Sequence, residues 1–296
     1  MGTFVPLVIL RFKKMMQQKL FIFIFVLLSN SGFTQNVDNK AVAGKFYFYW
    51  GYNRATFAVS DLHFAGPNYN FTLQKVKAFD RPSPFSVQEY FSLTKITIPQ
   101  YDYRIGYQWN GHWDISVGVD HMKYVVAQNQ SVLMTGTVSP AASIQYAGTY
   151  ANQSVVLKED FLRFEHTNGL NLVSLDIGYQ KDKFYFPKIN TTLSGHLGLG
   201  IGAVIPKTDS HVFGKGQDNP FHWSGYGVSG TVGLEARFWK NIFFRAQIRA
   251  GWIGLSDILL DNDAPERARQ NIQFVQYYGV LGKYFGFGAK ENLQRK

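Results

Sequence analysis

Cysteine is absent from all 296 residues of the chain. Without a thiol, the chain can have no disulfide framework, no thiolate metal ligand and no lipid attached to a cysteine. The absence also suits a protein exported through an oxidising compartment, where a stray thiol could mispair. No other pattern in the sequence predicts a metal ion or a cofactor, and we expect neither.

Long hydrophobic runs are also missing. The longest, LFIFIFVLL at residues 20–28, is far shorter than the roughly 20 residues of a membrane-spanning helix. Lys19 precedes this run and short polar residues follow it up to Gln35, which is the order of regions in a secretory signal peptide. We therefore predict a signal peptide at 1–35, with Met15 or Met16 as an alternative start. An uncleaved N-terminal anchor is the other interpretation of this segment.

Charged residues are scarce at 17% and aromatic residues reach the same 17%, yet the mean hydropathy is only -0.14. Strands that are apolar on one face and polar on the other cancel in such averages, which favours a membrane β-barrel. Four of the 30 basic residues lie in the leader, which leaves 26 basic against 20 acidic residues. This excess favours outer-membrane lipid and lipopolysaccharide as partners. The basic residues are scattered singly, so we expect no nucleic-acid partner.

Apolar and polar residues alternate over most of the chain after residue 44, with the period of a β-strand. Tyr101, Tyr103 and Ile105, for example, alternate with Asp102 and Arg104. The polar face is rich in Gly, Ser, Thr and Gln, which suits a narrow lumen filled by side chains. The last strand is aromatic on both faces, so its register stays ambiguous. The alternation predicts strands at 45–58, 97–109, 113–125, 173–180, 193–202, 228–238, 242–252 and 272–287.

Short turns alternate with long connections between these strands. The turns are expected at 110–111, 181–183 and 240–241, and the long connections at 59–96, 128–160, 206–221 and 257–269. Short turns on one side and long loops on the other are typical of outer-membrane barrels. We predict an all-β fold, namely a transmembrane antiparallel up-and-down β-barrel of eight strands. A hairpin around Gly66 would make ten strands if it entered the barrel wall.

This organisation divides the chain into four parts. The signal peptide is followed by a short periplasmic segment at 36–44, the outer-membrane barrel at 45–287 and a periplasmic tail at 288–296. The expected location is the outer membrane of a Gram-negative cell, with the signal peptide removed.

Nine charged residues fall on the inward face in this register. Because an unpaired buried charge is very costly, we expect them to form a hydrogen-bonded network that plugs the lumen. A gated ion path is the functional alternative, although an eight-stranded barrel has little room for one. The nine residues are Asp102, Arg104, Asp114, Asp120, Asp176, Glu235, Arg237, Arg245 and Arg249.

The C-terminal sequence, with Gly282, Phe285 and Phe287, resembles the terminal signal by which outer-membrane barrels are recognised for insertion. A tail follows Phe287 here, whereas that family usually ends on the aromatic residue. The whole mature chain resembles the small eight-stranded barrels, such as outer membrane proteins A, X and W, and phrases such as TIPQYDYRIGYQW resemble uncharacterised barrels of Bacteroidota. The resemblance implies the barrel-assembly machinery and periplasmic chaperones as partners during biogenesis. It implies no established activity.

One segment invites comparison with an enzyme. Lipid A deacylase is an eight-stranded barrel whose site uses a His, a Ser two residues on and a distant carboxylate. Here His166 is followed by Thr167 and Asn168, so Thr167 would have to supply the hydroxyl, although it points to the opposite strand face. An ordinary polar strand end is the simpler interpretation, and we expect no enzyme.

Three functions therefore remain open. The leading one is a structural or surface-interaction barrel with a filled lumen and long extracellular loops, whose surface ligand the sequence does not name. The second is a narrow porin-like conduit for small solutes. The third is a hydrolase that acts on lipid A at the outer rim.

Overall fold

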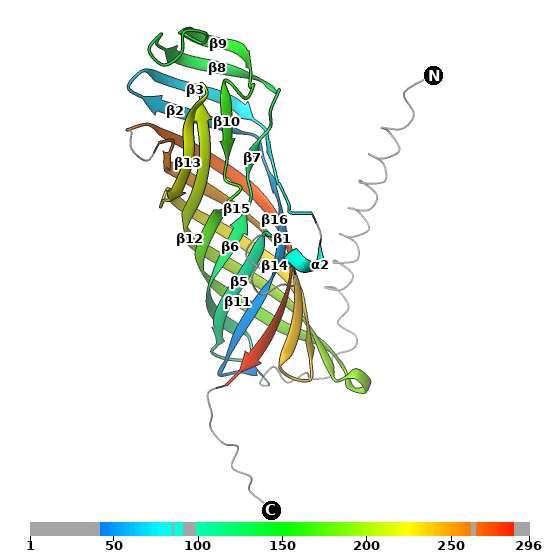
Figure 1. Cartoon of the computed structure of the whole chain (residues 1–296). Coiled ribbons are helices and arrows are strands. Elements are labelled where there is room, and N and C mark those ends of the chain that lie inside the picture. Colours follow the sequence, from blue (N-terminus) through cyan, green and yellow to red (C-terminus); the bar gives the residue numbers. More distant parts are fainter. Residues whose placement is uncertain (1–41, 85, 91–98, 262–264, 287–296) are drawn as a thin grey trace, which may run out of the picture. The chain divides into compact units, whose positions relative to one another are not determined.

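The computed structural model describes residues 42–84, 86–90, 99–261 and 265–286 (Figure 1). The predicted signal peptide, the tail at 288–296 and residues 36–41 lie outside the described residues. The described chain is an all-β, antiparallel structure, and this part of the prediction is confirmed. No helix among the described residues is long and apolar enough to cross a membrane. The strands are β1 (Lys45–Phe57), β2 (Ser60–Gly66), β3 (Tyr69–Val76), β4 (Ala78–Phe79), β5 (Tyr101–Gln108), β6 (Trp113–Met122), β7 (Val125–Val126), β8 (Ser131–Val138), β9 (Gly148–Val156), β10 (Leu162–Glu165), β11 (Leu170–Phe186), β12 (Thr191–Val212), β13 (Lys215–Phe221), β14 (Gly225–Phe238), β15 (Ile242–Leu259) and β16 (Arg267–Phe285), with short helical turns at α2 (Val87–Tyr90) and η2 (Pro187–Ile189).

Eight of these strands follow one another in a closed cycle of pairings. β1 pairs with β5, β5 with β6, β6 with β11 and β11 with β12. β12 then pairs with β14, β14 with β15, β15 with β16, and β16 with β1 again. These eight strands correspond to the eight segments that the sequence predicted as strands. Within the cycle, each strand therefore has a hydrogen-bonded neighbour on both sides.

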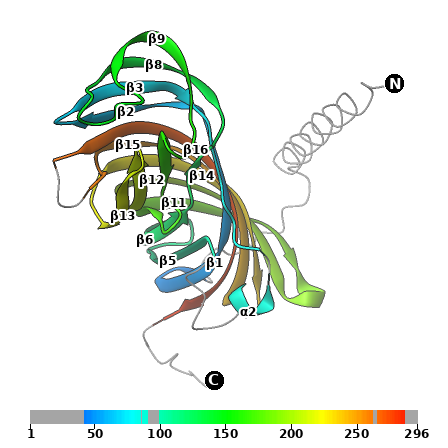
Figure 2. The ribbon, with the colours of Figure 1, turned by 45° about the horizontal axis from the view of Figure 1, so that its top comes forward.

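The described sheet nevertheless has 16 strands, more than the eight or ten expected. The expectation of long loops is wrong, because the segments 59–96, 128–160 and 206–221 contain β2, β3, β4, β8, β9 and β13. The hairpin of β2 and β3 forms, but β2 pairs with β16 and β3 pairs with β8, so it does not enter the cycle. Figure 2 shows β2, β3, β8 and β9 side by side beyond β16.

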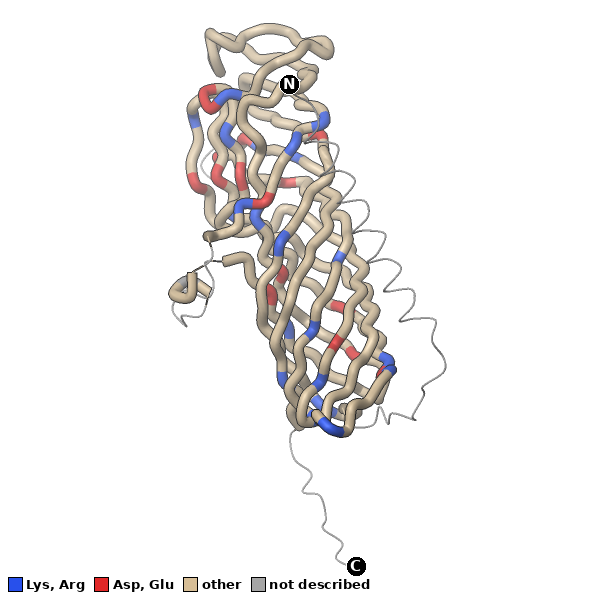
Figure 3. Tube along the Cα trace, turned by 90° about the vertical axis from the view of Figure 1, so that its right-hand side faces the viewer, with Lys and Arg blue, Asp and Glu red and all other residues tan. Residues whose placement is uncertain are grey.

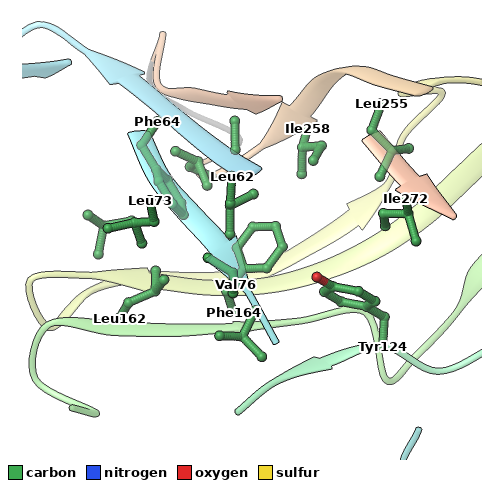
Figure 4. Close-up of a cluster of buried hydrophobic side chains, with 14 of the residues drawn as sticks. Leu62, Phe64, Leu73, Val76, Tyr124, Leu162, Phe164, Leu255, Ile258 and Ile272 are labelled. Carbon is green, nitrogen blue, oxygen red and sulfur yellow. The ribbon is translucent and has the colours of Figure 1, made fainter. Parts of the chain in front are cut away.

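We call this second part the head: the strands β2, β3, β4, β7, β8, β9, β10 and β13 with the adjoining ends of β12, β15 and β16. It has its own hydrophobic core (Figure 4), which includes Leu62, Phe64 and Phe164, each at most 1% exposed. Phe64 stacks on Phe71 at 5.0 Å and meets Phe164 edge-on at 5.8 Å. The supposed loops therefore fold because they carry their own alternating apolar residues and bury them together.

The three short turns lie at one end of the cycle. Asn110 closes the first, since its side-chain oxygen accepts hydrogen bonds from the backbone N–H groups of His112 and Trp113 at 2.7 and 2.8 Å. The third turn has Trp239 and Lys240 at positive φ, as a tight hairpin requires. The second turn is not at 181–183 as expected, because β11 runs on to Phe186 and the chain reverses through η2.

The structure also resolves the register of the last strand. Tyr278 and Tyr284 point inward and are 5% and 1% exposed, whereas Tyr277 and Leu281 point outward and are 51% and 62% exposed. Both faces of β16 are aromatic because the inner side chains fill the lumen and the outer side chains form part of the exposed outer surface of the cycle.

Candidate functional site

The interior of the eight-strand cycle is the candidate site, since it gathers charged side chains that are remote in sequence. All nine charged residues expected on the inward face are buried there, with exposed fractions of 7% or less. They come from β5, β6, β11, β14 and β15, and the period of two places them on one side of each strand.

Two aspartates and two arginines form the cluster nearer the head. Arg249 contacts Asp120 at 2.8 Å and Asp176 at 3.1 Å. Arg104 contacts Asp120 at 3.1 Å and also pairs with Asp176. Ser174 donates a further hydrogen bond to Asp176 at 2.7 Å. Each carboxylate is thus held between two guanidinium groups, which offsets the cost of removing four charges from water.

A second cluster, nearer the short turns, is built around Glu235. Arg245 donates to one oxygen of Glu235 through two nitrogens, at 3.1 and 2.7 Å. The Gln180 side-chain amide donates to the second oxygen of Glu235 at 2.9 Å. The Tyr284 hydroxyl lies 3.1 Å from the oxygen that Arg245 contacts. The guanidinium of Arg245 also lies over the rings of Phe243, Tyr47 and Tyr49 at 5.1 to 5.7 Å. Hydrogen bonds and aromatic faces together satisfy this buried pair.

Asp114 and Asp102 have no arginine contact of this kind. Asp114 accepts a hydrogen bond from the Tyr47 hydroxyl at 2.6 Å, and Nε2 of His196 lies 3.7 Å from its other oxygen. Asp102 accepts hydrogen bonds from the side-chain amides of Asn53 and Gln276, both at 3.2 Å. These two carboxylates are therefore held by neutral donors, not by the ion pairs that the sequence led us to expect.

Two further titratable side chains belong to this interior. His196 is buried beside Asp114, and Asp182 is the ion-pair partner of Arg237 at 2.7 Å, with its side chain 2% exposed. Asp182 falls in the turn expected at 181–183, but the alternation through Asp176, Gly178 and Gln180 already extends to it. With Asp182, the described interior contains six carboxylates and four guanidinium groups.

Little space remains between these groups. The gap bounded by Tyr47, Asp114, His196, Arg245 and Arg249 leaves about 10 Å³ for a water molecule, which is room for one. The arrangement holds the charges in place through ion pairs and hydrogen bonds, and it fills the interior.

His166 lies in the head, away from this interior. It is fully buried, and its Nδ1 forms a 3.0 Å hydrogen bond with the hydroxyl of Thr208, not with that of Thr167. Its ring packs against Phe164 and Tyr124 at 5.0 and 5.8 Å, and burial lowers the pKa of His166 to about 3. No hydrogen bond or ion pair of the described residues joins it to a carboxylate. His166 is therefore a neutral part of the head core, and the geometry assembles no hydrolase site around it.

The residues of the expected insertion signal lie at the end of β16. Gly282 packs against the ring of Phe243, where a Cβ atom would lie 2.2 Å from a ring carbon. Phe285 is the last residue of the strand and stacks on Phe46 at 6.3 Å. Phe287 lies outside the described residues. Gly282 thus has a packing reason that is independent of any recognition signal.

Among the described residues, no group of three or more His, Asp or Glu side chains is arranged to hold a metal ion. The sequence matches no protein-family model and no curated protein.

Several solved structures are similar in fold. The outer membrane protein AlkL is 11% identical, with 88% of this chain and 98% of that chain covered and a TM-score of 0.38. The outer membrane protein OprG from Pseudomonas aeruginosa is 10% identical, with 84% and 99% covered and a TM-score of 0.36. Ail, the attachment invasion locus protein of Yersinia pestis, is 10% identical, with 82% and 99% covered and a TM-score of 0.32.

Proposed function

We propose that the chain is an integral outer-membrane protein in which the eight-strand cycle is a closed transmembrane barrel and the head projects outside the cell. Its role is structural or surface interaction, carried out by the head. The observation that carries this proposal is that the polarity of both faces of the sheet inverts at the boundary between the cycle and the head.

On the inner face, polar side chains give way to apolar ones as the strands enter the head. On β6, the inward residue after Asp120 toward the head is Met122, and on β16 the inward residue next to Gln276 on the head side is Phe274. An apolar interior is what a domain surrounded by water requires.

The outer face changes in the opposite sense at the same level. On β14, every outward position of the cycle is apolar or glycine, and Tyr226, Val228 and Leu234 are 60%, 50% and 43% exposed. This stretch exceeds the roughly 9–11 residues that a tilted strand needs to cross a bilayer. On β16 the outward residues beyond the cycle are Arg269 and Asn271, both exposed. Lipid around the cycle and water around the head account for both changes.

The filled interior favours a barrel that does not conduct. Paired guanidinium and carboxylate groups occupy the cross-section, and the gap between them is only large enough for one water. We therefore expect no discrete conductance in planar bilayers, and regular single-channel steps from the purified protein would favour the porin-like alternative.

Cysteine labelling tests the membrane boundary directly, because the chain has no cysteine of its own. Leu281→Cys and Asn271→Cys both place a thiol on the outward face of β16, one in the cycle and one in the head. In protein refolded into vesicles, a membrane-impermeant maleimide should label Asn271→Cys and leave Leu281→Cys unlabelled until the bilayer is dissolved. Equal labelling of both, together with unchanged gel mobility on boiling, would mean that the cycle is a water-soluble sheet.

A further inference from the structure

Six lysines are gathered at the short-turn end of the cycle. Lys45 begins β1, Lys283 lies near the end of β16, and Lys240 lies in the turn between β14 and β15. Lys283 is opposite Ile242 in the pairing of β15 with β16, and the Lys45 amine donates a side-chain hydrogen bond to Asn241 at 3.0 Å. The other three are Lys181 and Lys183, in the last part of β11, and Lys188, in the helical turn η2 that follows it. Figure 3 shows Lys and Arg positions at this end of the cycle.

These lysines differ from four of the head's cations in having no acidic ion-pair partner among the described residues. Within the described residues none of the six takes part in an ion pair, and the neighbouring acid Asp182 is buried against Arg237. In the head, by contrast, ion pairs hold Arg81 to Glu165, Arg163 to Asp209, Lys207 to Asp218 and Arg267 to Asp257. The short-turn end therefore keeps its positive charge, whereas each of these four head cations is neutralised by a neighbouring acid.

Exposed aromatic side chains lie beside the lysines. Trp109, Trp113 and Trp239 are 47%, 41% and 68% exposed, and Tyr185 and Phe186 are 40% and 47% exposed. Aromatic rings of this kind settle at the level of lipid headgroups, and a lysine near them can extend its amine to a phosphate. The lysines and the aromatic rings thus both indicate the headgroup level of a bilayer at this end of the cycle.

We infer that the short-turn end is a binding surface for the phosphate headgroups of anionic phospholipids in the leaflet opposite the head. This inference rests on the proposed membrane location of the cycle and adds which lipid the short-turn end selects. Each unpaired lysine attracts an anionic headgroup beside it, and the attraction weakens with salt because it acts near water.

Competitive quenching of tryptophan fluorescence measures this preference. The full chain is refolded into vesicles of phosphatidylcholine or of phosphatidylcholine mixed with phosphatidylglycerol, with bromine carried by one lipid at a time. Trp50, Trp223 and Trp252 are replaced by phenylalanine in every form, so that Trp109, Trp113 and Trp239 at the lysine end report which lipid is adjacent. We expect phosphatidylglycerol to be favoured on the order of fivefold at low salt, the factor for one cationic side chain beside an anionic headgroup. High salt should remove most of the preference.

Matched variants separate this surface from general charge. The test variant replaces the exposed Lys181, Lys188, Lys240 and Lys283 by glutamine, and the control replaces the exposed head residues Lys75, Lys77, Lys158 and Lys215 in the same way. The test variant should lose the preference and the control should keep it. Arginine in place of the same four lysines should also keep the preference for phosphatidylglycerol.

The outcomes distinguish the inference from the proposed function. Insertion into both kinds of vesicle without a preference for phosphatidylglycerol overturns the lipid inference alone, and so does equal loss in both glutamine variants. Failure to insert into either kind of vesicle overturns the proposed barrel and the lipid inference with it.

Discussion

Replacing Arg249 by methionine removes one of the two cations that hold Asp120 and Asp176 inside the cycle. Methionine keeps a similar volume, so the change removes charge and hydrogen bonds with little loss of packing. Both carboxylates, 1% and 7% exposed, would then share Arg104 alone. Breaking a buried ion pair by removing one partner costs about 3–5 kcal/mol, and we expect a loss of stability in this range.

Urea unfolding of the refolded protein in detergent, followed by tryptophan fluorescence, measures the loss. The matched control is Arg163→Met in the head, since Arg163 contacts Asp209 at 3.0 Å but its side chain is 40% exposed. That change should cost less than about 1 kcal/mol. Adding Asp176→Asn to Arg249→Met should recover part of the loss, because one uncompensated charge is also removed. Equal costs for the two arginines, or strictly additive costs in the double variant, would refute the argument from burial.

Three further predictions concern the head and the lumen. Because burial lowers the pKa of His166 from its ordinary value of 6.5 to about 3, the unfolded chain binds the proton first as the pH falls. The contribution of His166 to the free energy of unfolding should therefore be full above about pH 6.5 and fall by about 1.4 kcal/mol per pH unit below it, until about pH 3. The midpoint of urea unfolding should depend less on pH in His166→Leu than in the unchanged protein. Gly178→Ala should cost about 1–3 kcal/mol in urea unfolding, because its Cβ would lie 2.3 Å from an oxygen of Asp114. Gly195→Ala, with nothing within 4 Å of its Cβ, should change stability by less than about 0.5 kcal/mol. Phe164→Ala should cost about 3–5 kcal/mol and open the head to proteases, while the boiling-dependent gel shift of the cycle persists.

The positions of the lumen charges were accessible from the sequence because strand geometry is local. Successive side chains of a strand point to opposite faces, so Asp102, Asp120 and Arg249 could be assigned inward without knowledge of their partners. Their contacts could not be assigned in this way. Asp102 lies opposite Asp120 across β5 and β6 and takes amide donors, and only the register between strands decides that.

The head shows the opposite limit. Leu62 and Phe64 alternate with Asp61 and His63, and the sequence indicated a hairpin around Gly66, but it did not indicate where that hairpin would pack. Alternation tells which residues share a face, but not whether lipid or water lies on the other side. That decision depends on which strands are neighbours, and therefore on contacts between residues far apart in the chain.

The sequence by itself determined the strand class, the eight alternating segments of the cycle, the inward face of seven of them and the positions of two of the three short turns. Each of these depends on a period of two or on the chemistry of a few adjacent residues. The tertiary structure alone decided the packing of the head, the partners of the buried charges and the lack of an ion-pair partner for the described lysines at one end. These features arise from pairing between distant strands, which fixes what each side chain meets and whether its charge is neutralised.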